Sequence, residues 1–345
     1  MPEQTCAVIL AGGEGKRMKS NHPKVLASVL FKPMLQWVMD AAEGAGVKEL
    51  CVVTGHKHEQ VEAYLQAAQK PGGANLHHVL QAEQRGTGHA VMMAEPFLRA
   101  HNGGNTLVLN GDAPFVSAEV LKTALAAHVG QGNAVTVISA ELDDPSGYGR
   151  IVRDPATGLV RAIVEQKDAD EATLAVREIN SGAYWFRTDD LLSILGCIRN
   201  DNAQGEYYLT DAVRLLIEQN KNAGAYIASD PAAVMGANDC VQLNSLNEIA
   251  RERVLHAQML AGVEIPCTDG VLIGPDVTIG RSTRILPNTI LRGNTAVGAD
   301  CSIGPSVVLT DCTVGDGASL CFASCEHANI SSSQAVAPFT VIGTP

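Results

Sequence analysis

The residues that could do chemistry begin with a glycine-rich loop near the N-terminus. The segment "AVILAGGEGKRM", residues 7–18, places four apolar residues directly before a glycine cluster, and the cations Lys16 and Arg17 follow. Glycine lets backbone N–H groups approach a phosphate closely, so a strand that ends in such a loop indicates an anion site. Two named phosphate motifs do not fit. A P-loop needs Ser or Thr directly after its lysine, and a dinucleotide fingerprint needs a third glycine where Met18 stands.

Composition and charge limit the class of protein and its partners. The chain of 345 residues exceeds the usual single domain, and its 46% hydrophobic residues with few aromatics are typical of a soluble, sheet-rich α/β protein. The formal charge of −12 argues against a nucleic-acid partner, which would need clustered Lys and Arg. The absence of a long apolar run and of a basic signal-peptide start predicts no membrane association and a cytoplasmic location.

Cysteine spacing gives no strong metal or disulfide motif. Nine cysteines are scattered without a zinc-ribbon spacing, which favours free thiols in a reducing compartment. Cys321, Cys325 and His327 are the one group that could hold a metal. Cysteine at a strand position is more often a small buried apolar residue, and this is the interpretation we favour.

Up to about residue 230, β-rich runs alternate with amphipathic helical patterns, which predicts βαβ units around a mainly parallel sheet. The predicted strands are Cys6–Leu10, Leu50–Thr54, His77–Leu80, Thr106–Asn110, Ala134–Ala140 and Gly182–Phe186. The predicted helices are Met34–Ala45, Glu59–Ala67, Ser117–His128, Asp189–Ile198 and Asp211–Glu218, with Pro33 in the first turn of the first and Ser117 as an N-cap. Such a sheet binds its ligand at the carboxyl ends of its strands, so the loops after Leu10, Leu80 and Asn110 are the first places to expect chemistry.

The C-terminal part follows a different period. A long amphipathic pattern from Cys240 to Leu260 predicts a linker helix, and an aliphatic residue then recurs every sixth position, typical of a parallel β-helix. The recurring residues are Ile273, Ile279, Ile285, Leu291, Val297, Ile303 and Leu309, with a slip of one residue at Val314 and Leu320 and a return at Ile330, Val336 and Ile342. We therefore expect domains at 1–239, 240–262 and 263–345.

Segments beyond the glycine loop point to a family. Lys24 follows in "NHPKVL", and then come "VLQAEQRGTGHA", "GDAPF", "DDPSGYGRIV", "IVEQKDA", "EINSG" and "NAQGEYYLTDA". In this order they resemble the sugar nucleotidyltransferases, most closely the bacterial N-acetylglucosamine-1-phosphate uridylyltransferases, over nearly the whole chain. The resemblance implies a Rossmann-like α/β nucleotidyltransferase domain, a short left-handed parallel β-helix, and transfer of a uridylyl group from UTP to N-acetylglucosamine 1-phosphate.

The resemblance also implies a role for each matching residue. It places Arg17 and Lys24 on the phosphates as catalytic cations and Mg²⁺ on Asp112 and Asn238. Nucleotide-binding residues would be Leu10, Ala11, Gly12, Gly13, Gln81, Gly86 and Thr87, and sugar-binding residues would be Asn110, Gly149, Glu165, Asn180, Tyr208 and Thr210. Taken singly, Thr87 could instead cap a helix, Glu165 could be a solvated edge residue and Tyr208 could belong to the core.

The residue types fit this chemistry. Two polyanions must meet, so cations must offset their repulsion, and a hard divalent ion prefers carboxylate and carbonyl oxygens. The nucleophile is already an anionic phosphate oxygen, so no general base is required. We therefore interpret His56, His58, His77, His78 and His89 as caps, surface or core residues.

Two departures from the family leave alternatives open. Asn110 stands where the family usually has Tyr, so transfer to another hexose 1-phosphate, of the glucose or mannose type, is the alternative substrate. The acetyl-transferring motifs of the bifunctional relatives have no match, and "SCEHANI" around His327 does not replace them, so we expect no acetyltransferase activity. The resemblance implies that the remaining coils assemble the chain as a homotrimer. A non-catalytic sugar-nucleotide-binding scaffold is the alternative from another class.

Overall fold

The structure is a computed structural model that describes residues 4–202 and 204–343. Its internal contacts divide the chain into two units, one of residues 1–27 with 33–240 and one of residues 28–32 with 241–345. The three-part domain division with boundaries at 239 and 262 stays a prediction. Three parts of the chain lie outside the described residues: residues 1–3, Ala203 within the segment "NAQGEYYLTDA", and the last two residues of the predicted third domain.

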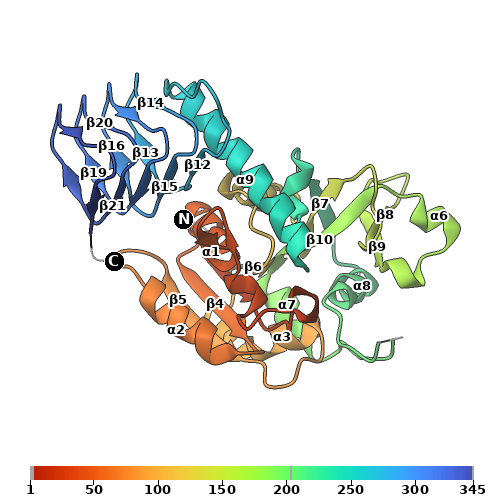
Figure 1. Cartoon of the computed structure of the whole chain (residues 1–345). Helices are drawn as coiled ribbons and strands as arrows, with labels where there is room; N and C mark the ends of the chain where they lie inside the picture. The colour runs from red at the N-terminus through yellow and green to blue at the C-terminus, as the bar shows by residue number, and fades with distance from the viewer. Residues whose placement is uncertain (1–3, 203, 344–345) are drawn as a thin grey trace. The chain divides into compact units, whose positions relative to one another are not determined.

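The first unit is built on one mixed sheet, in which the pairs β11·β7, β6·β1, β1·β4 and β4·β5 of the main strand order are parallel (Figure 1). The strand order is β11 (Ala223–Ile227), β7 (Val135–Glu141), β10 (Glu178–Arg187), β6 (Asn105–Asn110), β1 (Thr5–Leu10), β4 (Glu49–Thr54) and β5 (Asn75–Leu80), with β8 (Arg150–Arg153) and β9 (Val160–Val164) attached through β10. β10 runs antiparallel to its neighbours β6 and β7, and the pairs β10·β8 and β8·β9 are antiparallel as well. The predicted α/β sheet is therefore confirmed, and each predicted strand is present with shifted ends.

Helices cover both faces of this sheet because its central strands are apolar on both sides. Cys6 and Val8 of β1 pack with α3 (Thr87–Met93), α4 (Glu95–Ala100), α7 (Thr188–Leu195) and α8 (Thr210–Glu218). Ala7 and Ile9 of the same strand pack with α1 (Met34–Gly44), α2 (His58–Ala68) and α5 (Ala118–Gly130). The alternation along one strand thus explains the doubly wound architecture.

The helix predictions are confirmed with small changes at their ends. Ser117 caps α5, since its side chain accepts a hydrogen bond from the Val120 N–H. Pro33 is the residue before α1 and does not lie in its first turn. The short helices α3, α4 and α6 (Glu171–Leu174) and the strands β8, β9 and β11 were not predicted, because their apolar patterns are too short to show a period.

The second unit contains the hairpin formed by residues 28–32, the helix α9 (Cys240–Leu260) and a left-handed parallel β-helix, drawn in blue in Figure 1. Its three sheets are β12 (Leu272–Ile273), β15 (Ile290–Arg292), β18 (Val308–Thr310), β21 (Ser324–Glu326) and β24 (Val341–Ile342); β13 (Thr278–Ile279), β16 (Ala296–Val297), β19 (Thr313–Val314) and β22 (Asn329–Ile330); and β14 (Arg284–Ile285), β17 (Ser302–Ile303), β20 (Ser319–Leu320) and β23 (Ala335–Val336). The predicted repeat is confirmed.

One inward position of the β-helix was missed. Cys325 of β21 is the inward, buried residue between Leu320 and Ile330. The repeats on either side of it are each one residue shorter than the hexad. All nine cysteines are free thiols, as expected. Within residues 4–202 and 204–343, no three His, Cys, Asp or Glu side chains are grouped to hold a metal, and Cys325 is turned inward while His327 is exposed.

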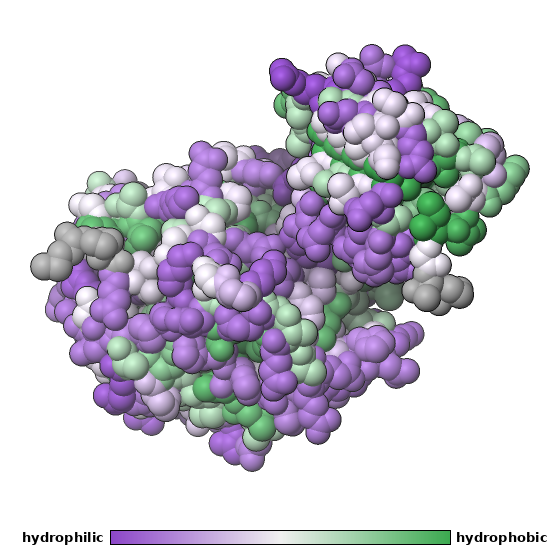
Figure 2. All heavy atoms as spheres, turned by 90° about the vertical axis from the view of Figure 1, so that its left-hand side faces the viewer, coloured by the Kyte–Doolittle hydropathy of each residue, from purple (hydrophilic) through white to green (hydrophobic). Residues whose placement is uncertain are grey.

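The surface of the β-helix is partly apolar near its last coil. Figure 2 shows green, hydrophobic residues at the lower end of the upper-right lobe, which is this unit. The rings of Phe322 and Phe339 in the β-helix stack with their centroids 5.8 Å apart, and Phe339 is 82% exposed. None of the helices in the described part of the chain has the length and apolar character needed to cross a membrane.

Candidate active site

A cavity of about 270 Å³ lies in the first unit at the carboxyl ends of β1 and β6. Its lining residues are Leu10, Gly12, Gly13, Lys24, Val25, Gln81, Gln84, Gly86, Thr87, Ala90, Asn110, Asp112 and Glu206. Nine of these were predicted as site residues from the sequence. The loops after Leu10, Leu80 and Asn110 therefore meet as expected for a doubly wound sheet.

The glycine loop is held close to the loop that follows β4. The His56 N–H donates to the Gly12 carbonyl oxygen at 3.1 Å, and a Cβ on Gly55 would lie only 2.5 Å from that oxygen. Ala11 is buried, and Gly13 is exposed at the cavity. Arg17 is exposed in the short 3-10 turn Lys16–Met18 and makes no hydrogen bond or ion pair with the described residues. Its guanidinium group is thus available to an anion, although it does not line the cavity.

The central charged group of the site is Lys24 with Asp112 and Asn238. The Lys24 ammonium forms an ion pair with the Asp112 carboxylate and donates to the Asn238 side-chain oxygen at 3.1 Å. The side chains of Lys24 and Asp112 are only 14% and 22% exposed, so this charge pair is poorly screened by water. One cation therefore already contacts the two oxygen ligands that were predicted for Mg²⁺.

Gln81, Gly86 and Thr87 form one wall of the cavity. Gln81 is buried, and its amide nitrogen donates to the Gly86 carbonyl oxygen and contacts His89 Nδ1, each at 3.1 Å. Gly86 has a φ of 104°, and a Cβ there would lie 2.6 Å from the Tyr207 carbonyl oxygen, so a larger residue would be strained. Gly86, and not Thr87, is the N-cap residue of α3.

Thr87 instead connects this wall to the segment before α8. Its hydroxyl oxygen accepts a hydrogen bond from the Leu209 N–H at 3.1 Å. The Gly88 N–H also donates to the Tyr207 carbonyl oxygen at 2.8 Å. The predicted nucleotide-binding residues at 86–87 are therefore fixed to the segment that carries the predicted sugar-binding residues Tyr208 and Thr210.

A bulge in β10 contacts Asn110, one of the residues that line the cavity. The pairing of β10 with β7 shifts register between Asn180 and Ala183, and bulges often re-aim side chains near active sites. The Asn180 side-chain oxygen accepts two hydrogen bonds, from the Tyr184 hydroxyl at 2.9 Å and from the Gly182 N–H at 3.0 Å. These two bonds occupy the side-chain oxygen of Asn180 and do not use its amide N–H₂.

Asn110 is fixed against the same bulge. Its amide nitrogen donates to the Ser181 carbonyl oxygen at 3.3 Å, and a Cβ on Gly182 would lie 2.2 Å from that nitrogen. Gly182 has a φ of 78°, so both its backbone conformation and its lack of a side chain are needed here. Asn110 therefore lines the cavity in a defined orientation. The hydrogen bond to Ser181 uses its amide nitrogen and not its side-chain oxygen.

Gly149, Glu165 and Asn180 lie together. The Asn180 N–H donates to the Gly149 carbonyl oxygen at 2.9 Å, and both carboxylate oxygens of Glu165 lie 3.4 Å from where a Cβ on Gly149 would be. Burial, and then the charge of Asp168, raise the pKa of Glu165. Glu165 is therefore not a freely solvated edge residue.

Tyr208 faces the same group of carboxylates. Burial first, followed by Glu206, Glu165 and other acidic groups, raises the pKa of its phenol. Tyr208 is half-buried, so it is not a core residue, and Thr210 is half-buried at the first position of α8. None of Gly149, Glu165, Asn180, Tyr208 and Thr210 lines the 270 Å³ cavity.

Several residues of the site were missed from the sequence. Gln84 and Glu206 line the cavity, and Tyr184, which is buried, acts on Asn180 through the hydrogen bond described above. Burial, and next the charge of Asp112, raise the pKa of Tyr148, a residue that the sequence analysis did not single out. Tyr148 belongs to the matched segment "DDPSGYGRIV", so its position beside Gly149 was the available signal.

Comparison with known proteins agrees with this architecture. The family model described as "Nucleotidyl transferase" matches residues 6–251, and the one described as "Bacterial transferase hexapeptide (six repeats)" matches residues 276–311. The chain is 43% identical to the "Bifunctional protein GlmU" of Caldanaerobacter subterraneus over 99% of its own length and 72% of that protein. It is also 43% identical to the protein of the same name from Streptomyces avermitilis, over 97% of this chain and 69% of that protein.

A solved structure shares the fold at lower identity. It is the crystal structure of a candidate glucose-1-phosphate thymidylyltransferase from Bacillus anthracis, with a TM-score of 0.61 and 19% identity. The match covers 72% of this chain and 96% of the other chain. The likeness supports the fold of the first unit and says nothing about the substrate.

Proposed function

The chain belongs to the GlmU family of nucleotidyl transferases, and we propose that it transfers a uridylyl group from UTP to N-acetylglucosamine 1-phosphate, giving UDP-N-acetylglucosamine and pyrophosphate. The observation that carries the proposal is the convergence of Lys24, Asp112 and Asn238 beside the glycine loop. A cation and two oxygen ligands at the carboxyl ends of the strands are what a nucleoside triphosphate needs.

We infer that Asp112 and Asn238 hold Mg²⁺. The residues fit this ion, because their oxygens already converge on one cation, the Lys24 ammonium. A carboxylate and an amide carbonyl are hard ligands that leave room for phosphate oxygens and water. When bound, Mg²⁺ would supply positive charge that offsets the repulsion between the two phosphate-bearing substrates.

The chain's own residues account for the other requirements of the reaction. The backbone N–H groups of the glycine loop are suited to the triphosphate, and Arg17, which has no ion pair with the described residues, would meet the departing pyrophosphate. Lys24 would release Asp112 and Asn238 and move to the phosphates. The sugar-phosphate oxygen attacks the α-phosphorus in line, and no side chain has to remove a proton from it.

The two walls of the site would divide recognition between base and sugar. Gln81, Gly86 and Thr87 would bind the uracil edge, and the buried amide of Gln81 is held in one orientation by Gly86. Asn180 would donate from its amide N–H₂ to the sugar or its N-acetyl group, and Glu165 would accept from sugar hydroxyls. Fixed polar groups give such a site its discrimination against the wrong substrate.

Asn110 favours a second candidate within the same reaction class. It lines the cavity as a short amide where the family usually has a tyrosine, which leaves more space near the sugar. Transfer to a glucose- or mannose-type 1-phosphate is therefore the alternative. Assembly as a homotrimer through the β-helix and a cytoplasmic location are further proposals that rest on the family and the hexapeptide repeats.

The experiment is a pyrophosphate-release assay with UTP, N-acetylglucosamine 1-phosphate and Mg²⁺, with the nucleotide product identified by mass. The proposal predicts stoichiometric formation of pyrophosphate and UDP-N-acetylglucosamine that stops when Mg²⁺ is chelated. An inactive but folded protein that binds UDP-N-acetylglucosamine would support the non-catalytic alternative instead. Release of thiol from acetyl-CoA with glucosamine 1-phosphate would contradict the expected lack of acetyl transfer.

A further inference from the structure

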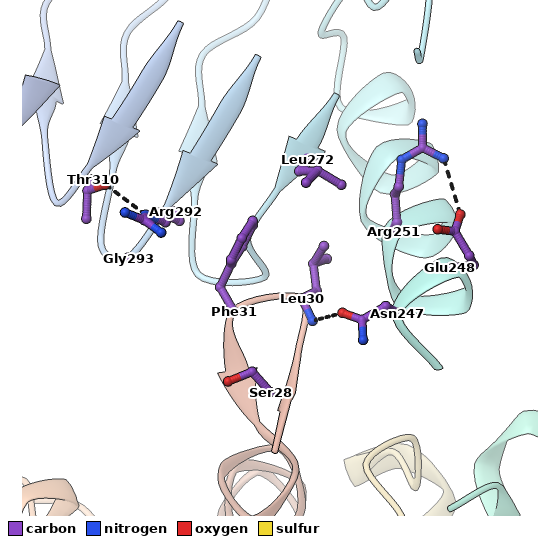
Figure 3. Close-up of a pocket in the computed structure, with 10 residues that line it drawn as sticks. All are labelled: Ser28, Leu30, Phe31, Asn247, Glu248, Arg251, Leu272, Arg292, Gly293 and Thr310. Carbon is purple, nitrogen blue, oxygen red and sulfur yellow. Dashed lines mark hydrogen bonds and ion pairs between the residues drawn. The ribbon is translucent and has the colours of Figure 1, made fainter. Parts of the chain in front are cut away.

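The second unit has a cavity of about 450 Å³ that shares no residue with the candidate active site (Figure 3). Three segments of this unit surround it: the hairpin, the first half of α9 and one sheet of the β-helix. The lining residues are Ser28, Leu30, Phe31, Asn247, Glu248, Arg251, Leu272, Arg292, Gly293 and Thr310. This volume is within the range of small-molecule sites in proteins.

The hairpin that presents Phe31 to the cavity has an unfavourable backbone conformation. Leu30 and Phe31 are consecutive and have φ values of 47° and 70°, at positions where two-residue hairpins normally carry Asn and Gly. Bulky residues at positive φ are strained, and such strain persists only where surrounding contacts impose it.

Contacts within the second unit fix this strained turn. The Leu30 N–H donates to the Asn247 side-chain oxygen at 2.8 Å, and Lys32 forms an ion pair with Asp276 at 2.7 Å. Leu30 is buried, whereas Phe31 remains 38% exposed. Figure 3 shows the Phe31 ring in the middle of the cavity, between the strand that carries Leu272 and the residues of β15 and β18. Holding an aromatic ring in this place is therefore what the strained turn achieves.

The exposed side chain of Arg292 also lines the cavity. Arg292 Nε donates to the Thr310 hydroxyl oxygen at 2.9 Å, which fixes the side chain. Its two terminal nitrogens have no partner among residues 4–202 and 204–343. A fixed guanidinium fork with free N–H groups matches a carboxylate or a phosphate in two parallel hydrogen bonds.

The second arginine of the cavity has a structural role. Arg251 donates to the Val271 carbonyl oxygen at 3.0 Å and to the Thr268 carbonyl oxygen, and it lies 3.6 Å from Glu248. Its charge still adds to that of Arg292, so the lining holds two cations and one carboxylate in a chain whose net charge is −12. The cavity is therefore locally basic on an acidic protein.

We propose that this cavity binds a small organic anion that carries a flat ring, with the ring against Phe31 and Leu272 and the anionic group on Arg292. The ring would gain contact with the aromatic face, and the oxyanion would complete the hydrogen bonds of the guanidinium group. An aromatic carboxylate and an aromatic phosphate share this chemistry. The carboxylate would bind Arg292 through its two oxygens, and the phosphate would carry one more negative charge than the carboxylate.

The test is calorimetric titration of the full chain with three probes: phenyl phosphate, benzoate and inorganic phosphate. We expect phenyl phosphate or benzoate to bind at least about tenfold more tightly than inorganic phosphate, because only they carry a ring. Whichever ring-bearing probe binds more tightly identifies the anionic group. Equal binding of inorganic phosphate and phenyl phosphate would contradict the role of Phe31.

Variants locate the bound probe. Arg292→Gln is expected to weaken the ring-bearing probe at least about tenfold, the usual cost of losing a charged hydrogen-bond partner. Phe31→Gly is expected to weaken it severalfold, and it places a residue suited to positive φ in the turn, so folding is not at risk from strain. Arg284→Gln is the matched control, because Arg284 is an exposed arginine of the same β-helix that pairs with Glu264 at 2.8 Å.

Probe binding by further variants and the sedimentation coefficient distinguish this cavity from the active site and from a contact between copies of the chain. Lys24→Ala should leave binding unchanged; loss of binding in that variant alone would assign the probe to the active site and overturn the proposal. Binding that Arg292→Gln and Phe31→Gly both leave unchanged would also overturn it. If these two variants instead change the sedimentation coefficient and no probe binds, the cavity is a contact between copies of this chain.

Discussion

The Lys24 ammonium donates a hydrogen bond to the side-chain oxygen of Asn238 at 3.1 Å, although the two residues are 214 positions apart in the sequence. The same ammonium pairs with Asp112. The structure thus joins three segments of the chain at one point, directly beside the glycine loop. A lysine that bridges two oxygen ligands can leave them when a metal ion and a triphosphate arrive, because the phosphates offer it a stronger negative charge.

Asp112→Ala is expected to lower turnover about a thousandfold or more and to leave the fold intact, since it removes the carboxylate of the proposed metal site. Pyrophosphate release at saturating substrates measures the loss, and circular dichroism checks the fold. Asp201→Asn, a change at an exposed acid, is the control and should keep full activity. Undiminished activity of Asp112→Ala would refute the metal assignment.

Lys24→Met should separate metal binding from catalysis. The variant removes the ammonium that contacts Asp112 and Asn238, so Mn²⁺, used as a paramagnetic substitute for Mg²⁺, should bind more tightly in the absence of nucleotide. Turnover should still fall roughly a hundredfold, because a cation that offsets phosphate charge is lost. Lys48→Met, at an exposed lysine 3.6 Å from Glu43, should change neither quantity. Weaker Mn²⁺ binding in Lys24→Met would contradict the bridging role.

Tyr184→Phe tests whether the hydroxyl positions Asn180. The variant deletes the 2.9 Å hydrogen bond and lets the Asn180 amide rotate. We expect the KM for the sugar phosphate to rise several-fold to about tenfold, with little change in the KM for UTP or in kcat. Tyr226→Phe, a half-buried tyrosine of β11, is the control. An equal loss with both substrates would indicate a general structural effect instead.

His128 predicts a pH dependence of stability. Burial, and next the charge of Arg187, lower the pKa of His128 from 6.5 to about 4, so the folded protein holds this ring neutral while the unfolded chain protonates it. Stability is therefore complete above the unfolded pKa and decreases as the pH falls from about 7 toward about 4, by roughly 3 kcal/mol from this group. Urea unfolding across that interval measures it. His128→Gln should flatten the slope; an unchanged slope would show that other groups cause it.

Much of the fold was predictable because its apolar patterns are regular. Strands such as β1 and β4 are short continuous apolar runs, and the inward residues of the β-helix follow the hexad from Ile273 to Leu309. The antiparallel direction of β10 was not predictable, since a strand's own sequence does not show the direction of its neighbours. Cys325 was missed because a cysteine replaces the aliphatic residue where two turns shorten.

The site was predicted in its parts but not in its arrangement. The resemblance gave Lys24, Asp112 and Asn238 as separate residues, and only the folded chain shows that one ammonium bridges the other two. Tyr184 could not be found, because its contact with Asn180 depends on a register shift within β10. A bulge changes which side chains share a face, and a period of two residues gives no sign of it.

The most direct test of the proposed function is a substrate panel. Initial rates of pyrophosphate release would be measured with UTP and dTTP, each paired with N-acetylglucosamine, glucose and mannose 1-phosphate in the presence of Mg²⁺. We predict the highest kcat/KM for UTP with N-acetylglucosamine 1-phosphate, at least about a hundredfold above the other sugars, as expected of a site with fixed polar groups. A higher kcat/KM with glucose or mannose 1-phosphate would contradict the proposed substrate and assign the specificity change to the position of Asn110.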